Sequence, residues 1–150
     1  MPESKNGSSL SIRPIANTDA EAVAQLSGEL GYPVSVSAME ERIRHFANVP
    51  GHMVFVACVS DALVGWIDVG IVHHLQAEPY GEIGGLVVSH TRRSAGIGRE
   101  LVKQAERWVT EQGLSKMVVR SRTTREAAHR FYLREGYSMT KTSAVFSKDL

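Results

Sequence analysis

A glycine-rich turn near the middle of the chain has the composition of an anion-binding site. An apolar strand pattern ends at residues 86–88, and Gly96 and Gly98 open a helical pattern. Amides at a helix start have no partner within the helix, and the helix dipole adds positive potential there. Glycine lets a phosphate approach this backbone closely. Three arginines surround the turn: Arg92, Arg93 and Arg99. The turn therefore fits a phosphate-bearing ligand, and a purely structural tight turn is the alternative.

Two familiar phosphate-binding motifs do not fit this turn. A Walker loop needs Gly-Lys-Ser/Thr, which does not follow the glycines. A dinucleotide fingerprint needs a third glycine, where this chain has Leu101. It also needs an acidic ribose ligand about 20 residues further on, where Lys116 and Met117 stand. The interpretation that remains is a diphosphate ligand bound by a motif of another kind.

The elements that must position this turn follow from periodicity and turn residues. Alternating or continuous apolar runs predict strands, and apolar residues at helical spacing predict helices. The spacings of Thr18 with Glu21 and of Ser37 with Glu40 predict capping boxes at two helix starts. Pro79 predicts a loop over residues 75–81. The predicted order is β-α-α-β-β-β-α-β-α-β-β, with the last two strands near 137–139 and 143–147. This order favours an α/β (α+β mixed) fold with a mixed central sheet.

Composition restricts the class of protein. The chain has 150 residues, which fits one domain over residues 10–150, and its polar opening predicts a disordered tail over residues 1–9. Its net charge of +1 gives no reason to expect nucleic acid or a membrane surface as partner. The single cysteine, Cys58, and the lack of a signal-peptide pattern predict a cytoplasmic protein. None of the six histidines has a cysteine or carboxylate at a convincing metal-ligand spacing, so no metal is expected.

Two ordered motifs carry a resemblance to a known superfamily. Arg93-x-x-Gly96-x-Gly98 resembles the Q/R-x-x-G-x-G/A signature of the GNAT superfamily of N-acetyltransferases, and residues 128–137 resemble its A-x-x-F-Y-x-x-x-G-F/Y motif. The opening Ile12-Arg13-Pro14 is also similar, so the resemblance covers essentially the whole chain. It implies a mostly antiparallel sheet of six to seven strands flanked by four helices.

The resemblance implies acetyl-CoA as cosubstrate. Residues 86–88 would pair with the pantetheine arm as an added strand, and the signature loop would bind the diphosphate. Many members have Asn where this chain has Arg125, which we expect to reach a phosphate instead. The expected cofactor-binding residues are Leu86, Val87, Val88, Arg93, Ser94, Ala95, Gly96, Ile97, Gly98, Arg99 and Arg125.

The resemblance also suggests the groups that carry the chemistry. Glu82 occupies the place of the catalytic glutamate of the histone-acetylating branch, and is the candidate general base. Tyr132 matches the tyrosine that points at the coenzyme A sulfur, and is the candidate general acid. The backbone N–H of Val88 or a near neighbour is the expected donor to the thioester carbonyl. His73 or His74 is an alternative base.

The acceptor side is less closely specified. Tyr32, Asp68 and His73 are the expected substrate-binding residues, and the carboxylates of Asp68, Glu78 and Glu82 suit a cationic amine. Residues 72–93 faintly resemble aminoglycoside 6'-N-acetyltransferases, without assigning that substrate. We expect acetyl transfer to the primary amine of a small molecule. A protein lysine or N-terminus as acceptor, or a non-catalytic acyl-CoA-binding regulatory module, are the alternatives. A homodimer stays open because superfamily members often pair through late strands.

Overall fold

The computed structural model describes residues 9–92 and 95–150. The described chain forms two compact units, the first ending at Val119 and the second covering residues 120–150. The predicted N-terminal tail lies almost wholly outside the described residues. The prediction of one domain over residues 10–150 stays a prediction.

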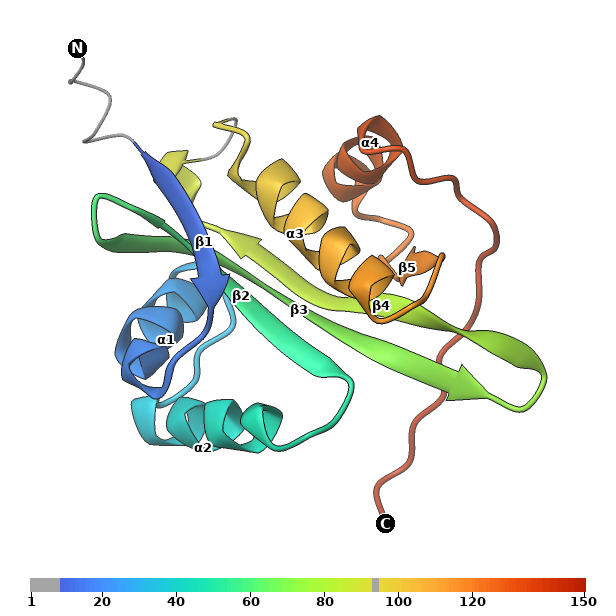
Figure 1. Ribbon diagram of the computed structural model, residues 1–150, viewed down its shortest axis with the longest axis horizontal. Helices are drawn as coiled ribbons and strands as arrows, with labels where there is room; N and C mark the ends of the chain where they lie inside the picture. Colours follow the sequence, from blue (N-terminus) through green and yellow to red (C-terminus); the bar gives the residue numbers. More distant parts are fainter. Residues whose placement is uncertain (1–8, 93–94) are drawn as a thin grey trace. The chain divides into compact units, whose positions relative to one another are not determined.

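A five-stranded sheet forms the centre of the first unit (Figure 1). Its strands are β1 (Leu10–Pro14), β2 (His52–Val59), β3 (Ala62–His74), β4 (Ala77–Val88) and β5 (Met117–Val119), and they lie side by side in sequence order. The first three pairings are antiparallel and the β4–β5 pairing is parallel. Ser60 and Asp61 join β2 to β3 with positive φ angles of 50° and 70°, as a tight hairpin turn requires. The mixed sheet predicted from the element order is confirmed.

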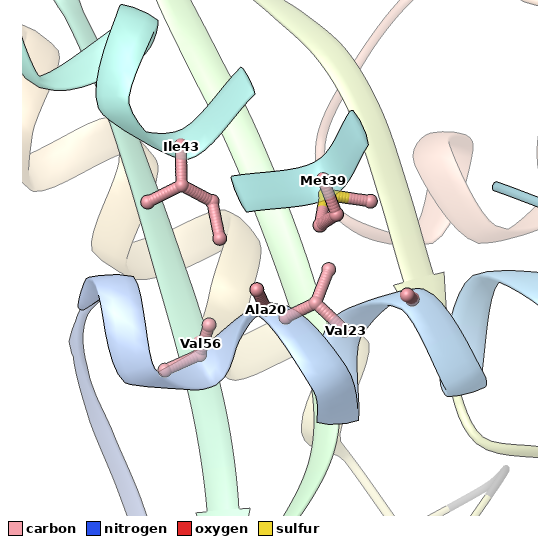
Figure 2. Packing of buried hydrophobic residues seen from close by; sticks show 6 residues of the cluster. Ala20, Val23, Met39, Ile43 and Val56 are labelled. Atoms are coloured by element: carbon pink, nitrogen blue, oxygen red, sulfur yellow. The ribbon is translucent and has the colours of Figure 1, made fainter. Parts of the chain in front are cut away.

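Helices cover both faces of this sheet (Figure 1). The 3-10 turn η2 (Asn17–Asp19) leads into α1 (Ala20–Glu29), and α2 (Val36–Ala47) packs against α1. Both lie on the sheet face to which Val56 of β2 points. Figure 2 shows side chains of the two helices pointing toward one another above this valine, from Ala20, Val23, Met39 and Ile43. We call this side of the sheet the α1–α2 face.

The opposite face is covered by α3 (Ile97–Glu111), which follows the short 3-10 turn η3 (His90–Arg92). Leu101 of α3 is fully buried against Gly65 of β3, and Val109 lies against Gly81 of β4. The two glycines leave room for the helix to lie close to the sheet. The start of α3 is thereby fixed beside the end of β4.

The second unit contains one helix, α4 (Glu126–Arg134), and no strand among residues 120–150. The two strands predicted near 137–139 and 143–147 are absent, so the sheet has five strands instead of six to seven. Alternation along a segment predicts which side chains share a face, but a strand also needs a neighbouring edge for its backbone. Val145 and Phe146 are 89% and 92% exposed, so neither is packed as a strand residue would be.

Three local predictions are also wrong. Ser35, not Ser37, caps α2, since its Oγ accepts a hydrogen bond from the Ala38 N–H at 3.1 Å. Thr18 does not cap α1, because it lies within the 3-10 turn that precedes it. The loop predicted around Pro79 is strand, and Pro79 is tolerated because it lies where the β3–β4 register is interrupted between Val72 and His74.

An ion pair ties β1 to the start of the helical layer. The guanidinium of Arg13 donates to both carboxylate oxygens of Asp19 at 2.8 Å and 2.9 Å, and the Ala16 N–H donates to Asp19 at 2.7 Å. Asp19 is only 7% exposed. The Arg13 hydrogen bonds hold the pKa of the Asp19 carboxyl below its usual value, although burial opposes them.

We expect Asp19→Asn to destabilise the fold by about 2 kcal/mol at neutral pH, because a charge-assisted bidentate contact is lost. A depressed pKa contributes stability above the unfolded pKa, and this contribution is lost as pH falls through the folded pKa. The difference between the two proteins should therefore shrink below about pH 4. Urea unfolding across pH measures it, with Asp61→Asn in the exposed hairpin turn as control. Equal stability of the two variants at pH 7 would contradict this role.

Candidate active site

The two edges of β4 are paired unequally. β3 pairs along β4 to Val88, whereas β5 pairs only with Gly81, Glu82 and Ile83. From Gly84 to Val88, no strand of the described residues lies on the β5 side. Backbone N–H and C=O groups on such an edge can pair with an added extended chain. Three expected cofactor-binding residues lie along it: Leu86, Val87 and Val88.

The start of α3 has the features of an anion site. Gly96 precedes the helix with φ +81°, a left-handed conformation that favours glycine, and no side chain caps the helix there. The first α-helical hydrogen bond runs from the Glu100 N–H to the Gly96 carbonyl at 3.1 Å. The amides of Ile97 and Gly98 therefore have no partner within the helix. Ile97 is 3% exposed, so its side chain anchors the first turn in the core.

The structure places the remaining signature residues around this helix start. Ala95 and Arg99 are exposed beside it, as is Arg92 at the end of η3. Arg93 and Ser94, both expected to bind the cofactor, lie outside the described residues. Among the described ones, the turn joins an open strand edge to a helix start without a side-chain cap.

Glu82 and Asp68 lie on the α1–α2 face of the sheet. Glu82 is opposite Gly70 of β3, and Asp68 is opposite Gly85 of β4. Between these two pairs the register shifts, and Gly84 is the extra residue of a β-bulge. The pattern brings two carboxylates that sequence reasoning had singled out onto neighbouring positions of one surface.

The bulge fixes the Asp68 carboxylate. A side chain at Gly84 would collide with that carboxylate, and one at Gly85 would crowd both it and the ring of Trp66. The Gly84 N–H donates a hydrogen bond to Asp68. Burial raises the pKa of the Asp68 carboxyl to about 6, although the charge of His52 and the Gly84 N–H act in the opposite direction. Asp68 therefore changes charge close to neutral pH.

His52 is a site residue that sequence reasoning missed. Its ring lies over Gly70, between β2 and the position of Glu82, and contacts the Phe46 ring at a centroid distance of 5.4 Å. Its Nδ1 atom is buried without a hydrogen-bond partner, as is the Nε1 atom of Trp66, among the residues with described side chains. His52 is the first residue of β2, and the apolar run that follows it predicts a strand without indicating a role for the histidine. The sequence did contain one signal: His52 and Val54 are two residues apart, and alternate residues of a strand lie on the same face of the sheet.

The other predicted acceptor residues lie elsewhere. His73 is exposed near the end of the β3–β4 hairpin, five residues beyond Asp68, which is about 16 Å along a strand. His74 beside it contacts the Tyr80 hydroxyl at 3.3 Å. Tyr32 is 62% exposed and lies three residues after the end of α1. Neither His73 nor His74 shares the immediate surroundings of Asp68.

Tyr132 is described within the second unit. It lies on α4 in contact with the rings of Phe131 and Tyr137, at centroid distances of 5.1 Å and 5.7 Å. Burial raises the pKa of its phenol, while the charge of Arg125 lowers it. Arg125 immediately precedes α4. The predicted approach of Tyr132 and Arg125 to the cofactor stays a prediction.

The described residues contain neither a cluster of metal ligands nor a membrane-spanning helix. In residues 9–92 and 95–150, no three His, Cys, Asp or Glu side chains come together in a way that could hold a metal ion. No helix in these ranges has the length and apolar character needed to cross a membrane.

Comparison with known proteins shows the family to which the chain belongs. The chain belongs to the acetyltransferase (GNAT) family, whose model matches residues 20–137. Members of this family take acetyl-CoA as acetyl donor. Aminoalkylphosphonate N-acetyltransferase of Salmonella typhimurium is 38% identical over 86 residues, which are 57% of this chain and 56% of that protein. The match thus spans little more than half of the relative's length.

Solved structures show the same fold over nearly the whole chain. The aminoglycoside N-acetyltransferase AAC(6')-Iy, bound to the bisubstrate analogue CoA-S-monomethyl-acetylneamine, superposes with a TM-score of 0.84 at 18% identity. This superposition covers 95% of this chain and 100% of that one. The aminoglycoside 6'-N-acetyltransferase AAC(6')-Ih of Acinetobacter baumannii gives a TM-score of 0.81 at 18% identity, covering 95% and 99%. At these identities the likeness establishes the fold.

We expect Asp68→Asn to raise stability at pH 7 to 8 by about 1–2 kcal/mol, because an ionised carboxylate is removed from a half-buried position. A carboxyl whose folded pKa is raised disfavours the folded state once it ionises. The gain should therefore vanish as pH falls through about 6 toward 4, where the wild-type side chain is neutral in both states. Thermal unfolding of both proteins from pH 4 to pH 8 measures it. A gain that is independent of pH would contradict the assigned pKa.

Proposed function

We propose that the protein is an N-acetyltransferase that moves the acetyl group of acetyl-CoA directly to a primary amine of a small molecule. The observation that carries this proposal is the continuity of the β4 edge, open from Gly84 to Val88, with the glycine-opened start of α3. A pantetheine arm needs backbone partners and a diphosphate needs free amides. Both needs are met in order along one stretch of chain.

The cofactor would be held chiefly by backbone. Leu86, Val87 and Val88 would pair with the pantetheine amides, and the amides of Ile97 and Gly98 would bind the diphosphate. Guanidinium groups would neutralise the phosphates, from Arg92, Arg93, Arg99 and Arg125. Gly96 precedes these amides in a left-handed conformation, so this position should be sensitive to any side chain.

The chemistry requires three events. The acceptor amine attacks the thioester carbon, the carbon–sulfur bond breaks, and the amine proton leaves. Glu82 is proposed to take the proton, the β4 backbone near Val88 to donate to the carbonyl oxygen, and Tyr132 to protonate the departing thiolate. In support, Glu82 lies one residue before the end of the β4–β5 pairing, next to the open part of the β4 edge.

The acceptor is proposed to be small. The curated relative is named for an aminoalkylphosphonate, and two structural relatives are named for aminoglycosides. All three are small-molecule amines. A panel of amines with detection of released thiol tests the proposal, and a protein or peptide amine belongs in the same panel. Turnover of the peptide alone would replace the small-molecule acceptor.

Gly96→Ala should weaken acetyl-CoA binding about tenfold, because a Cβ at positive φ costs about 1–2 kcal/mol and shifts the amides. Gly113→Ala is a matched control. It lies at the other end of α3 with φ +86°, and both glycines have open space around the missing Cβ. The two variants should lose similar stability, while only Gly96→Ala loses affinity by calorimetry. Equal affinities in the two variants would remove the helix start from the cofactor site.

Glu82→Gln should lower kcat at least tenfold and flatten its rise with pH, because the proton acceptor is lost. Tyr132→Phe should slow the chemical step while leaving the dissociation constant of acetyl-CoA nearly unchanged. Glu111→Gln, an exposed carboxylate at the end of α3, is the control. Stopped assays from pH 6 to 9 measure these effects. Wild-type turnover in the Glu82 variant across that range would exclude the glutamate as base.

A further inference from the structure

The two carboxylates on the α1–α2 face are diagonal neighbours across adjacent strands. Glu82 pairs with Gly70, and Asp68 lies two residues before Gly70 on the same strand. Diagonal neighbours of this kind are about 7–8 Å apart, within reach of one small ligand. One surface of the proposed acceptor site therefore presents two negative groups at a defined spacing.

The charge of His52 partly offsets that of the Asp68 carboxylate, and Glu82 adds a second negative group. His52 faces Asp68 from β2 and Glu82 from β4. From α1 and α2, the side chains packed on this face are apolar, including Val23, Met39 and Ile43. Arg13 of β1 lies on the same face, but its guanidinium is bound to Asp19.

A cation would find more than one partner beside Asp68. An ammonium group has three donors and no acceptor, so it needs several acceptors when it is buried. The carboxylate of Asp68 is held by the Gly84 N–H, which fixes its oxygens in position to accept from a cation. The aromatic ring of Trp66 lies beside the carboxylate over Gly85 and adds a surface that favours cations.

We propose that the acceptor carries two amino groups, and that Asp68 binds the one that stays charged while Glu82 serves the one that is acetylated. This inference rests on the proposed acetyltransferase function. The spacing of these two strand positions suits nitrogens separated by three to five carbon atoms, about 5–7 Å, in an extended chain. Asp68 is then a specificity-determining residue, and diamines and amino sugars with a second amine are the matching substrate class.

The same charges disfavour acceptors with an anionic second group. A phosphonate or carboxylate at the position of the second amine would face Asp68, and like charges at short range repel. We therefore predict a different acceptor preference from that implied by the name of the Salmonella relative, an aminoalkylphosphonate N-acetyltransferase.

The proposal predicts a pH dependence that Glu82 alone does not. When Asp68 is protonated it no longer attracts a cation, so the KM of a diamine should rise as pH falls below about 6. The diamine itself stays doubly charged throughout that range, because alkylammonium groups titrate near pH 10. A monoamine should show no such rise.

Three acceptors of matched length test the inference: diaminobutane, aminobutanol and aminobutyric acid. Steady-state thiol release is measured at saturating acetyl-CoA for the wild type, for Asp68→Asn and for Asp61→Asn in the exposed hairpin turn. The wild type and Asp61→Asn should prefer the diamine over the amino alcohol at least tenfold in kcat/KM, as expected for a charge-assisted contact. Aminobutyric acid should be the poorest acceptor.

In Asp68→Asn the preference for the diamine should fall to within about twofold. The change should come from a higher KM with little change in kcat, and the rise of KM below pH 6 should disappear. A merely structural role for Asp68 would alter all three acceptors alike. An equal wild-type rate for diamine and amino alcohol, or a preference that persists in Asp68→Asn, would overturn the inference.

The outcomes separate this inference from the function on which it rests. Turnover of amines without any preference for a second amino group overturns the inference and leaves the acetyltransferase function intact. Absence of both acetyl-CoA binding and turnover with every acceptor overturns the proposed function and the inference together. The wild-type acceptor ranking and its pH dependence decide the question even without the variant.

Discussion

The unequal pairing of the two edges of β4 is the constraint on which the rest of the site depends. Backbone N–H and C=O groups require hydrogen-bond partners, and β4 receives them from β3 along most of its length. On the other edge, β5 supplies them for three residues and then separates. The residues that follow must find partners in water or in a ligand. The same strand then leads through η3 into α3, so the open edge and the free helical amides lie in one continuous segment.

The β-bulge at Gly84 lies between the open part of the β4 edge and Asp68 of β3. An extra residue in β4 turns two successive glycines toward Asp68, and neither has a side chain to occupy the space. The carboxylate and the Trp66 ring fill part of that space, so a half-buried acidic group is held by backbone. The open edge of β4 and the position of the Asp68 carboxylate therefore lie beside one local break in sheet regularity.

Much of this arrangement could be predicted from residue types, and some of it could not. The apolar patterns predicted the order of the elements up to α4. The phosphate site indicated by the glycines and arginines of the turn stays a prediction. Pro79 misled because a proline usually ends a strand, and only the register of the hairpin shows where it is tolerated. His52 was missed because its importance depends on facing Gly70 across the sheet. The last two strands were wrongly predicted because alternation does not reveal whether a partner edge exists.

The burial of Asp68 has a consequence for protein engineering. A charged group that is costly to bury tends to be replaced when thermal resistance is the sole criterion. Libraries of this chain screened by heat challenge should accumulate neutral residues at this position, and their members should acetylate amines with little discrimination. Robustness and selectivity would then compete at a single side chain, so a useful screen must reward both properties at once.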